Sequence, residues 1–219
     1  MYIPTHFAEE RLDILHQLIQ AHPLGTLVTL EQDGMNANHL PFEIAAPSAD
    51  APFGTLRAHI ARSNPLWKNL DNTKEALVVF QGPQAYITPS WYEEKKLSGK
   101  VVPTFNYAVV HAHGNLRVVD DAQWLLNLLH RLTDQHEGKR ASPWQVSDAP
   151  EDYLQKMLTA IIGIEIPLTR LSGKWKVSQN RPQQDRLNIA AGLREDGDQT
   201  KAAMAALVAA SANAAQSKA

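Results

Sequence analysis

The sequence reads GTLRAHIARSNPLWK from residue 54 to residue 68, and its pattern changes in the middle of this run. The first half alternates between polar and apolar residues, which is typical of a β-strand and places Arg57 and His59 on one face. A serine, an asparagine and a proline follow, and these residues suit the cap and the first turn of a helix. We therefore predict a strand over residues 53–61 that passes directly into a short helix.

The junction between that strand and that helix has the groups that bind a phosphate dianion. Free backbone N–H groups and the positive end of a helix dipole attract an anion. Arg62 and Ser63 add a cation and a hydroxyl group. The same residues also suit an ordinary capped helix with a solvent-exposed arginine. Taken alone, the segment favours this second interpretation, because capping signals are common.

The rest of the chain reads as short strands joined by hairpins, with helices late in the sequence. Further strands are predicted at 25–30, 38–44, 76–80, 84–88, 101–119 with a break near Gly114, 163–171 and 174–178, and Asp33-Gly34 marks a hairpin. Helices are predicted at 8–22, 121–137, 151–162 and 183–194, followed by a partly frayed helical tail that is rich in alanine. This order predicts an α+β fold whose mostly antiparallel sheet closes into a small barrel.

Composition and charge narrow the class of protein. The chain has 219 residues, no cysteine and a formal net charge of −2. The lack of cysteine excludes disulfides and thiolate metal sites, and it fits a reducing compartment. We find no signal peptide and no membrane-spanning run, so we expect a cytoplasmic protein. A protein that grips DNA through its phosphates is usually basic, and here only residues 170–186 carry a local excess of positive charge.

Three further segments combine aromatic and polar residues. Residues 86–92 crowd Trp91 and Tyr92 into a loop, which suggests a pocket lid or a dimer interface. Residues 102–107 place Asn106 beside Tyr107, which can stack on a planar ligand, although strand packing explains the same pattern. Residues 172–181 carry cations and amides that can reach an anionic ligand or can protect a strand edge from aggregation.

His111 and His113 share one face of a predicted strand, and such a pair can bind a metal ion. No third ligand is evident nearby and the chain has no HExxH pattern, so we predict a structural pair and no metal site. The chain also lacks the glycine-rich motifs of Rossmann and P-loop proteins and the GxSxG motif of α/β-hydrolases. Spacing alone identifies no catalytic acid and base, so the catalytic residues stay unknown.

Six segments, taken in order, resemble the PaiB-type family of FMN-binding negative transcriptional regulators. They are MYIPTHF at 1–7, HLPF at 39–42, GTLRAHIARSNPLW at 54–67, YITPSWY at 86–92, VPTFNY at 102–107 and GKWKVSQNRP at 173–182. The resemblance extends from residue 1 to about residue 194. It implies an FMN-binding split-barrel domain over residues 1–194, with the alanine-rich helical tail over residues 195–219.

The resemblance also implies a cofactor site. Related pyridoxamine-phosphate-oxidase-like flavin proteins are homodimers with FMN at the subunit interface. By analogy, we expect the phosphate at His59, Ile60, Ala61, Arg62, Ser63 and Asn64, with Arg57 and Lys68 nearby. We expect the ring system beside His39, Trp91, Asn106 and Tyr107, with Lys174 and Trp175 supplied by the partner subunit.

Functions from different classes fit this resemblance. The family label implies a negative transcriptional regulator, which would need to bind DNA. The second of the helices predicted at 183–194 and 198–212 is rich in alanine, however, and has no face that reads base edges. A flavin-linked sensor therefore suits the residues better. The alternative is an FMN-dependent oxidoreductase of broad specificity, in which the flavin carries the redox chemistry. A haem-binding protein is a further alternative, because related split barrels handle haem.

Overall fold

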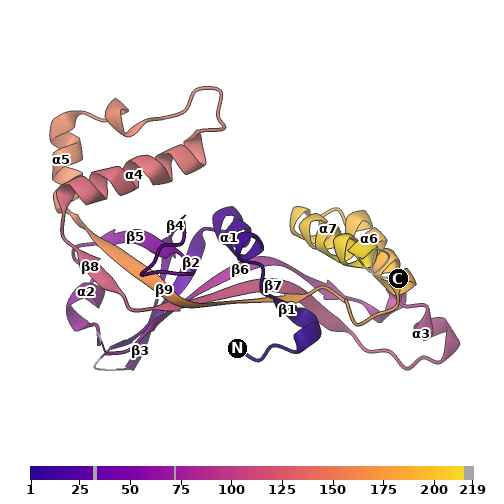
Figure 1. The fold of residues 1–219 in the computed structure, drawn as a ribbon. Coiled ribbons are helices and arrows are strands. Elements are labelled where there is room, and N and C mark those ends of the chain that lie inside the picture. Colours follow the sequence, from indigo (N-terminus) through magenta and orange to yellow (C-terminus); the bar gives the residue numbers. More distant parts are fainter. Residues whose placement is uncertain (32–33, 72, 215–219) are drawn as a thin grey trace. The chain divides into compact units, whose positions relative to one another are not determined.

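The computed structural model describes residues 1–31, 34–71 and 73–214 (Figure 1). Its strands are β1 (Ala8–Glu9), β2 (Leu24–Glu31), β3 (Gly34–Pro41), β4 (Glu43–Ala45), β5 (Thr55–Ala61), β6 (Ala76–Ile87), β7 (Thr104–Gly114), β8 (Arg117–Val119) and β9 (Ile161–Lys176). They pair in the order β3-β2-β6-β7-β9-β5-β4, and β1 and β8 each pair with β9. The pairs whose registers are assigned are antiparallel, so the α+β class with a mostly antiparallel sheet is confirmed.

Helices precede, interrupt and follow these strands. They are η1 (Thr5–Phe7), α1 (Leu12–Ala21), α2 (Leu66–Asn69), η2 (Pro89–Trp91), α3 (Glu94–Leu97), α4 (Ala122–Glu137), η3 (Val146–Asp148), α5 (Glu151–Thr159), α6 (Gln183–Glu195) and α7 (Gln199–Ala214). Within the described ranges, none of these helices is both long and apolar enough to cross a membrane.

The chain forms two compact units that are interleaved along the sequence. The terminal unit contains residues 1–15, 81–110 and 172–219, and the central unit contains residues 16–80 and 111–171. Strands β6, β7 and β9 contribute residues to both units. The boundary that the sequence predicts between residues 194 and 195 stays a prediction.

The core of the central unit forms where β5 pairs with β9. Alternate residues of β5 are at most 2% exposed, namely Leu56, Ala58 and Ile60. Arg57 and His59 lie between them in sequence and are only half-buried, as the alternation predicts. The antiparallel register places Leu56 opposite Ile166 and His59 opposite Gly163. The inward residues of the two strands therefore pack on the same side of the sheet.

Helix α4 packs in the central unit on Gly163, which lies opposite His59 of β5 in the sheet. The carboxylate of Asp121 caps the helix by accepting a hydrogen bond of 2.7 Å from the Trp124 N–H. The Trp124 ring fills the space over Gly163, where a Cβ atom would lie 2.4 Å from Cζ3 of that ring. The buried leucines of α4 are Leu125, Leu128 and Leu132. Full burial of each leucine stabilises the fold by about 1.5–3 kcal/mol.

The core of the terminal unit combines β6, β9 and the helix pair α6 and α7. Its buried members are Ala85, Ile87, Tyr92, Val177, Ile189, Ala190, Leu193, Met204, Ala205 and Val208. Alanine offers little area to bury, and the sequence therefore predicts a helical, partly frayed tail. The structure shows a continuous helix over Gln199–Ala214, as the helical tail predicts, and Met204 and Val208 are fully buried within it.

Several predicted elements have different limits in the structure. The predicted helix at 8–22 begins only at Leu12, because β1 pairs Ala8 with Lys174 on β9. The strands predicted at 76–80 and 84–88 are one strand, since the fixed φ angle of Pro83 is compatible with extended backbone. The predicted helix at 151–162 ends at Thr159, where β9 follows almost at once. Asp33 of the predicted hairpin lies outside the described residues, and Gly34 has a φ of 128°.

Substitution of Gly192 by alanine tests the packing of the terminal unit. An alanine inside a helix is normally more stable than glycine by about 0.5–1 kcal/mol. At position 192, however, the new Cβ would lie 2.2 Å from Cε2 of Trp91. We therefore expect Gly192→Ala to destabilise the protein by about 1–3 kcal/mol in chemical denaturation. The exposed Arg194→Ala on the same helix is the control and should change stability by less than about 0.5 kcal/mol. A Gly192→Ala protein as stable as the wild type would contradict the packing described.

Candidate functional site

Arg62 is held by groups of its own chain. Its Nη1 and Nη2 atoms donate to the two carboxylate oxygens of Asp120 at 3.0 and 2.6 Å. Its Nε and Nη2 atoms also donate to the carbonyls of Thr159 at 3.0 Å and Ile161 at 3.1 Å. The hydrogen bond from Arg62 lowers the pKa of the Asp120 carboxyl group. The bidentate fork that a phosphate would use is therefore filled by a carboxylate, although that carboxylate is largely exposed.

Arg57 is part of a row of alternating charges across the central unit. The strand register places Glu43 opposite Arg57, Arg57 opposite Glu165, and Glu165 opposite Arg117. The Arg57 Nε atom donates to Glu165 at 3.0 Å, and Arg131 of α4 donates to Glu43 at 2.7 Å. Opposite charges on neighbouring strands stabilise a sheet. Arg57 therefore has a structural partner before any ligand binds.

The turn after β5 is ordered by side-chain hydrogen bonds. Asn64 accepts a 3.0 Å hydrogen bond from the Leu66 N–H and donates at 2.9 Å to Oδ1 of Asn38. The Trp67 ring donates to the Arg62 carbonyl at 3.0 Å. The predicted strand-to-helix junction is present, but α2 has only four residues and its first N–H is already capped by Asn64. The helix end alone therefore offers little to an anion.

Other predicted residues of this turn differ in accessibility. Ile60 is 2% exposed, and Ala61 and Ser63 are exposed to solvent. Lys68 is exposed, with its Nζ atom 4.9 Å from the centre of the Trp67 ring. Among the described residues, no carboxylate forms an ion pair with Lys68. Lys68 and Ser63 are thus the groups of this turn that remain available to an anion.

A polar surface on the β2–β3 hairpin lies beside this turn, and we call it the inner hairpin face. Its members are Thr29, Glu31, Asn36 and Asn38, because the register pairs Thr29 with Asn36 and Leu27 with Asn38, and paired residues share a face. Asn36 donates to Glu31 at 2.7 Å. Two buried atoms of this face, Oγ1 of Thr29 and Nδ2 of Asn38, have no hydrogen-bond partner. Unpaired buried polar atoms are costly, so they indicate a ligand or bound water.

Sequence analysis named His39 and missed the inner hairpin face. His39 is exposed and, by alternation along β3, lies on the face opposite Asn38. The available signal was in β2, where Thr29 and Glu31 continue the two-residue period of the buried Gly25 and Leu27. Polar residues at inward positions of a strand indicate a site within the fold.

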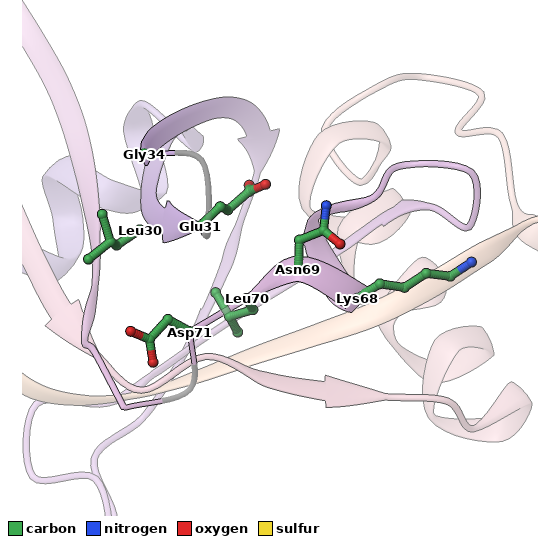
Figure 2. A pocket seen from close by; sticks show the side chains of 7 residues that line it. All are labelled: Leu30, Glu31, Gly34, Lys68, Asn69, Leu70 and Asp71. Carbon is green, nitrogen blue, oxygen red and sulfur yellow. The ribbon is translucent and has the colours of Figure 1, made fainter.

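A pocket of about 600 Å³ adjoins the same region (Figure 2). It is lined by Leu30, Glu31, Gly34, Lys68, Asn69, Leu70 and Asp71. Figure 2 shows the polar ends of Glu31 and Asn69 on one side of the pocket, and the Lys68 side chain extending away from Glu31. Oδ1 of Asp71 accepts hydrogen bonds from the Thr73 backbone and hydroxyl, so this carboxylate oxygen is already used. Glu31, Lys68 and Asn69 supply the polar chemistry of the wall.

The remaining predicted residues belong to the terminal unit. Asn106 is 1% exposed and donates at 2.9 Å to the Ser178 hydroxyl. The centre of the Tyr107 ring lies 5.3 Å from Nζ of Lys174, which is 9% exposed. Trp91 and Trp175 pack against the core that α6 and α7 share. These two rings are thus used in packing, and their predicted contact with a cofactor stays a prediction.

Among the described residues, no cluster of three or more histidine, aspartate or glutamate side chains could hold a metal ion. Burial lowers the pKa of His111 and of His113. His59 also has a lowered pKa, because burial disfavours its charged form. Its Nδ1 atom is buried and has no hydrogen-bond partner.

Comparison with known proteins finds both sequence relatives and structural neighbours. Residues 1–170 match the family described as "Putative FMN-binding domain". The chain is 38% identical over 230 residues to an uncharacterized protein of Emericella nidulans, and the alignment covers 90% of this chain and 92% of that protein. It is 30% identical over 208 residues to the protease synthase and sporulation protein PAI 2 of Bacillus subtilis, covering 95% of this chain and 96% of that protein.

Solved structures show the same fold at low sequence identity. A conserved hypothetical protein from Mycobacterium tuberculosis matches with a TM-score of 0.56 and 12% identity, covering 83% of this chain and 94% of that chain. A flavocytochrome from Azotobacter vinelandii matches with a TM-score of 0.55 and 13% identity, covering 80% of this chain and 72% of that chain. At these identities the likeness concerns the fold alone, and the expected split β-barrel class is confirmed.

The lowered pKa of His59 gives an expected pH dependence. In the unfolded chain the imidazole takes up a proton near pH 6.5, whereas in the folded protein it stays neutral to lower pH. The unfolded state therefore binds more protons below pH 6.5, and stability is lost as the pH falls. We expect the free energy of unfolding to fall more steeply between pH 8 and pH 5.5 in the wild type than in His59→Gln.

The difference in stability between the two proteins at pH 8 is the control, because His59 is then neutral in both the folded and the unfolded state. At that pH, only the packing lost with the imidazole separates His59→Gln from the wild type. Parallel pH profiles for the wild type and His59→Gln would show that the burial of His59 carries no proton linkage.

Proposed function

Because the chain belongs to the family described as "Putative FMN-binding domain", we propose that it binds FMN through the central unit and acts as a flavin-linked sensor of the PaiB type. The observation that carries this proposal is the pair of unpartnered buried atoms on the inner hairpin face, Oγ1 of Thr29 and Nδ2 of Asn38. A ligand with many hydrogen-bonding groups satisfies such atoms, whereas an apolar ligand leaves them unpaired.

The residues of the central unit fit the chemical groups of FMN. Ser63 and Lys68 are available to the phosphate, and Arg62 joins them where the phosphate replaces the exposed Asp120 carboxylate. Solvent screens an exposed ion pair and leaves it weak, so a phosphate dianion can compete for this arginine. Thr29 and Asn38 suit the carbonyl, imide and hydroxyl groups of the flavin and its ribityl chain.

FMN supplies reversible hydride and electron chemistry when it is bound, and the protein supplies binding and orientation. Ile60 and Ala61 would contribute backbone groups at the end of β5. His39, Arg57 and His59 stay predictions from the resemblance, as do the terminal-unit residues Trp91, Asn106, Tyr107, Lys174 and Trp175. The proposal does not depend on any of them.

A sensor role fits the chain better than direct repression. The relative in Bacillus subtilis is named for protease synthase and sporulation. Yet α7 presents mainly alanine and holds Met204 and Val208 in the core, so it has no face for reading bases. We propose that a cytoplasmic homodimer, with FMN at its interface, reports the state of its flavin to another component.

The pocket beside Lys68 favours a second candidate function, an FMN-dependent oxidoreductase of broad specificity. Its volume of about 600 Å³ admits a small molecule, and Glu31 and Asn69 offer polar groups to orient one. Reoxidation of NADH or NADPH by the FMN-loaded protein, with a rate that rises on adding a small acceptor, would favour this function over the sensor.

Retention of flavin tests cofactor binding directly. We expect the purified protein, mixed with FMN and desalted, to keep a flavin absorbance band. Lys68→Gln should weaken FMN binding about tenfold, because a hydrogen bond to a charged group contributes about 1.5–3 kcal/mol. The same substitution should leave the affinity for riboflavin, which has no phosphate, unchanged. The exposed Lys74→Gln in the same unit is the matched control. Loss of all flavin on desalting, or a band typical of haem in the purified protein, would contradict the proposal.

A further inference from the structure

Three cations gather at the end of β9 in the terminal unit, namely Lys174, Lys176 and Arg181. Lys174 is only 9% exposed, and its Nζ atom donates to the Tyr2 carbonyl at 3.1 Å. Throughout residues 1–31, 34–71 and 73–214, no ion pair joins any of these cations to a carboxylate. This contrasts with Arg57 and Arg62 of the central unit, each of which has a carboxylate partner.

The three charges act on one another. Burial lowers the pKa of the Lys176 amine, and the positive charges of Lys174 and Arg181 lower it further. Lys176 donates to the hydroxyl of Thr104 and the carbonyl of Phe105, so neutral oxygens are its partners. The Arg181 guanidinium lies 4.6 Å from the centre of the Tyr92 ring. Half-buried cations without an anion are unfavourable, and a bound anion relieves this cost.

The nearest acidic residue in sequence does not neutralise the cluster. Asp185 is 3% exposed, and its Oδ1 atom accepts a 2.9 Å hydrogen bond from the Glu93 N–H. The carboxylate of Asp185 is therefore used to hold the loop after β6, and it forms no ion pair with Arg181.

The backbone that presents Arg181 is fixed by a strained residue. Ser178 has a backbone φ of 65°, which residues other than glycine rarely adopt. Its buried hydroxyl is hydrogen-bonded to Asn106, and its carbonyl accepts a 2.9 Å hydrogen bond from the Arg181 N–H. Gln179 accepts a 2.8 Å hydrogen bond from the Val177 N–H. Strain of this kind persists where the surrounding structure holds it, and it is common at binding sites.

Lys174 and Lys176 share their face of the sheet with exposed aromatic rings, and Arg181 lies in the turn that follows β9. The residues turned to the interior are Trp175 of β9, Ala85 and Ile87 of β6, and Ala108 of β7, and Val177 just after β9 joins them. By the two-residue period, the opposite face carries Lys174, Lys176, Phe105, Tyr107 and Tyr86. Tyr86 is 50% exposed and Phe105 is 56% exposed, with their rings in an edge-to-face arrangement. Ring surfaces beside cations suit a planar ligand that carries an anionic group.

We propose that this face of the terminal unit binds a second small ligand, an aromatic compound that bears a phosphate or carboxylate group. Lys176 and Arg181 hold the anionic group, Lys174 adds its charge, and Tyr86 and Phe105 contact the ring. FMN has a single phosphate, and the proposed function assigns that phosphate to the central unit. The inference rests on the proposed function in this respect alone. With the flavin phosphate bound in the central unit, the cations of the terminal unit remain available to the co-substrate or signal of the flavin protein.

Calorimetric titration of the FMN-saturated protein with phenyl phosphate tests this site. Phenol and inorganic phosphate separate the contributions of the ring and of the anion, and benzoate tests a carboxylate. We expect phenyl phosphate to bind more tightly than phenol or inorganic phosphate. Lys176→Gln and Arg181→Gln should each weaken its binding about tenfold or more, because each removes a charge-assisted hydrogen bond. The exposed Lys100→Gln in the same unit should bind like the wild type.

FMN titrations of the same variants separate this inference from the proposed function. We expect Lys176→Gln and Arg181→Gln to bind FMN as the wild type does. If both variants lose FMN and phenyl phosphate together, or if FMN displaces phenyl phosphate, the cluster is the flavin phosphate site and a second ligand is excluded. Equal binding of phenyl phosphate by all variants would also overturn the inference. Binding of phenyl phosphate by a protein that retains no flavin would support the site while contradicting the proposed function.

Thermal unfolding of each variant shows whether a loss of binding reflects a loss of folding. Arg181→Gln removes a side chain whose noted contact is the face of the Tyr92 ring, so it decides the result if Lys176→Gln does not fold.

Discussion

The pairing of cations with carboxylates determines where this protein can accept an anion. In the central unit, Asp120 and Glu165 already hold the guanidinium groups of Arg62 and Arg57. Lys68 in that unit, and the cluster of Lys174, Lys176 and Arg181 in the terminal unit, have no such partner among the described residues. Lys68 is exposed to solvent, whereas Lys174 is buried, and a buried charge without a partner is costly. We therefore propose these unpaired cations as the places where an anion binds.

Polar atoms inside the central unit impose the same constraint on hydrogen bonding. The inner hairpin face places Thr29 and Asn38 at inward positions of β2 and β3, yet neither Oγ1 of Thr29 nor Nδ2 of Asn38 has a partner. An apolar residue at either position would avoid this cost. A ligand or bound water would satisfy these atoms, and the family described as "Putative FMN-binding domain" makes FMN the ligand that we propose.

The sequence predicted an element well where neighbouring residues alone decide its conformation. The alternation of residues 53–61 predicted β5, which begins two residues later at Thr55. Ser63 or Asn64 was expected to cap α2, and Asn64 accepts the hydrogen bond from the Leu66 N–H. The prediction failed where contacts between residues distant in sequence decide the structure. The continuity of β6 through Pro83 and the start of α1 at Leu12 depend on strand pairing, and the burial of α7 depends on α6. The split-barrel class followed from six motifs in order, and no single motif would have identified it.

The site was predictable in part. Arg62, Ser63 and Asn64 could be named because capping residues and a cation stand together in the sequence. Their partners could not, since Asp120 is distant in sequence from Arg62, and Asn38 comes from another hairpin. His39 was predicted from the resemblance alone, whereas the direction of its side chain depends on the register of β2 and β3. Register is set by the whole hairpin and cannot be read from one residue.

The side-chain amide of Asn38 gives the most direct test of the central claim, that FMN binds at the inner hairpin face. Its Nδ2 resonances can be assigned in a ¹⁵N-labelled protein with the help of Asn38→Asp, and then followed during an FMN titration. The account predicts a large shift of the Asn38 amide as its unpartnered N–H gains an acceptor, together with retention of the flavin. An unchanged Asn38 amide in a protein saturated with FMN would contradict it, because the cofactor would then be bound elsewhere.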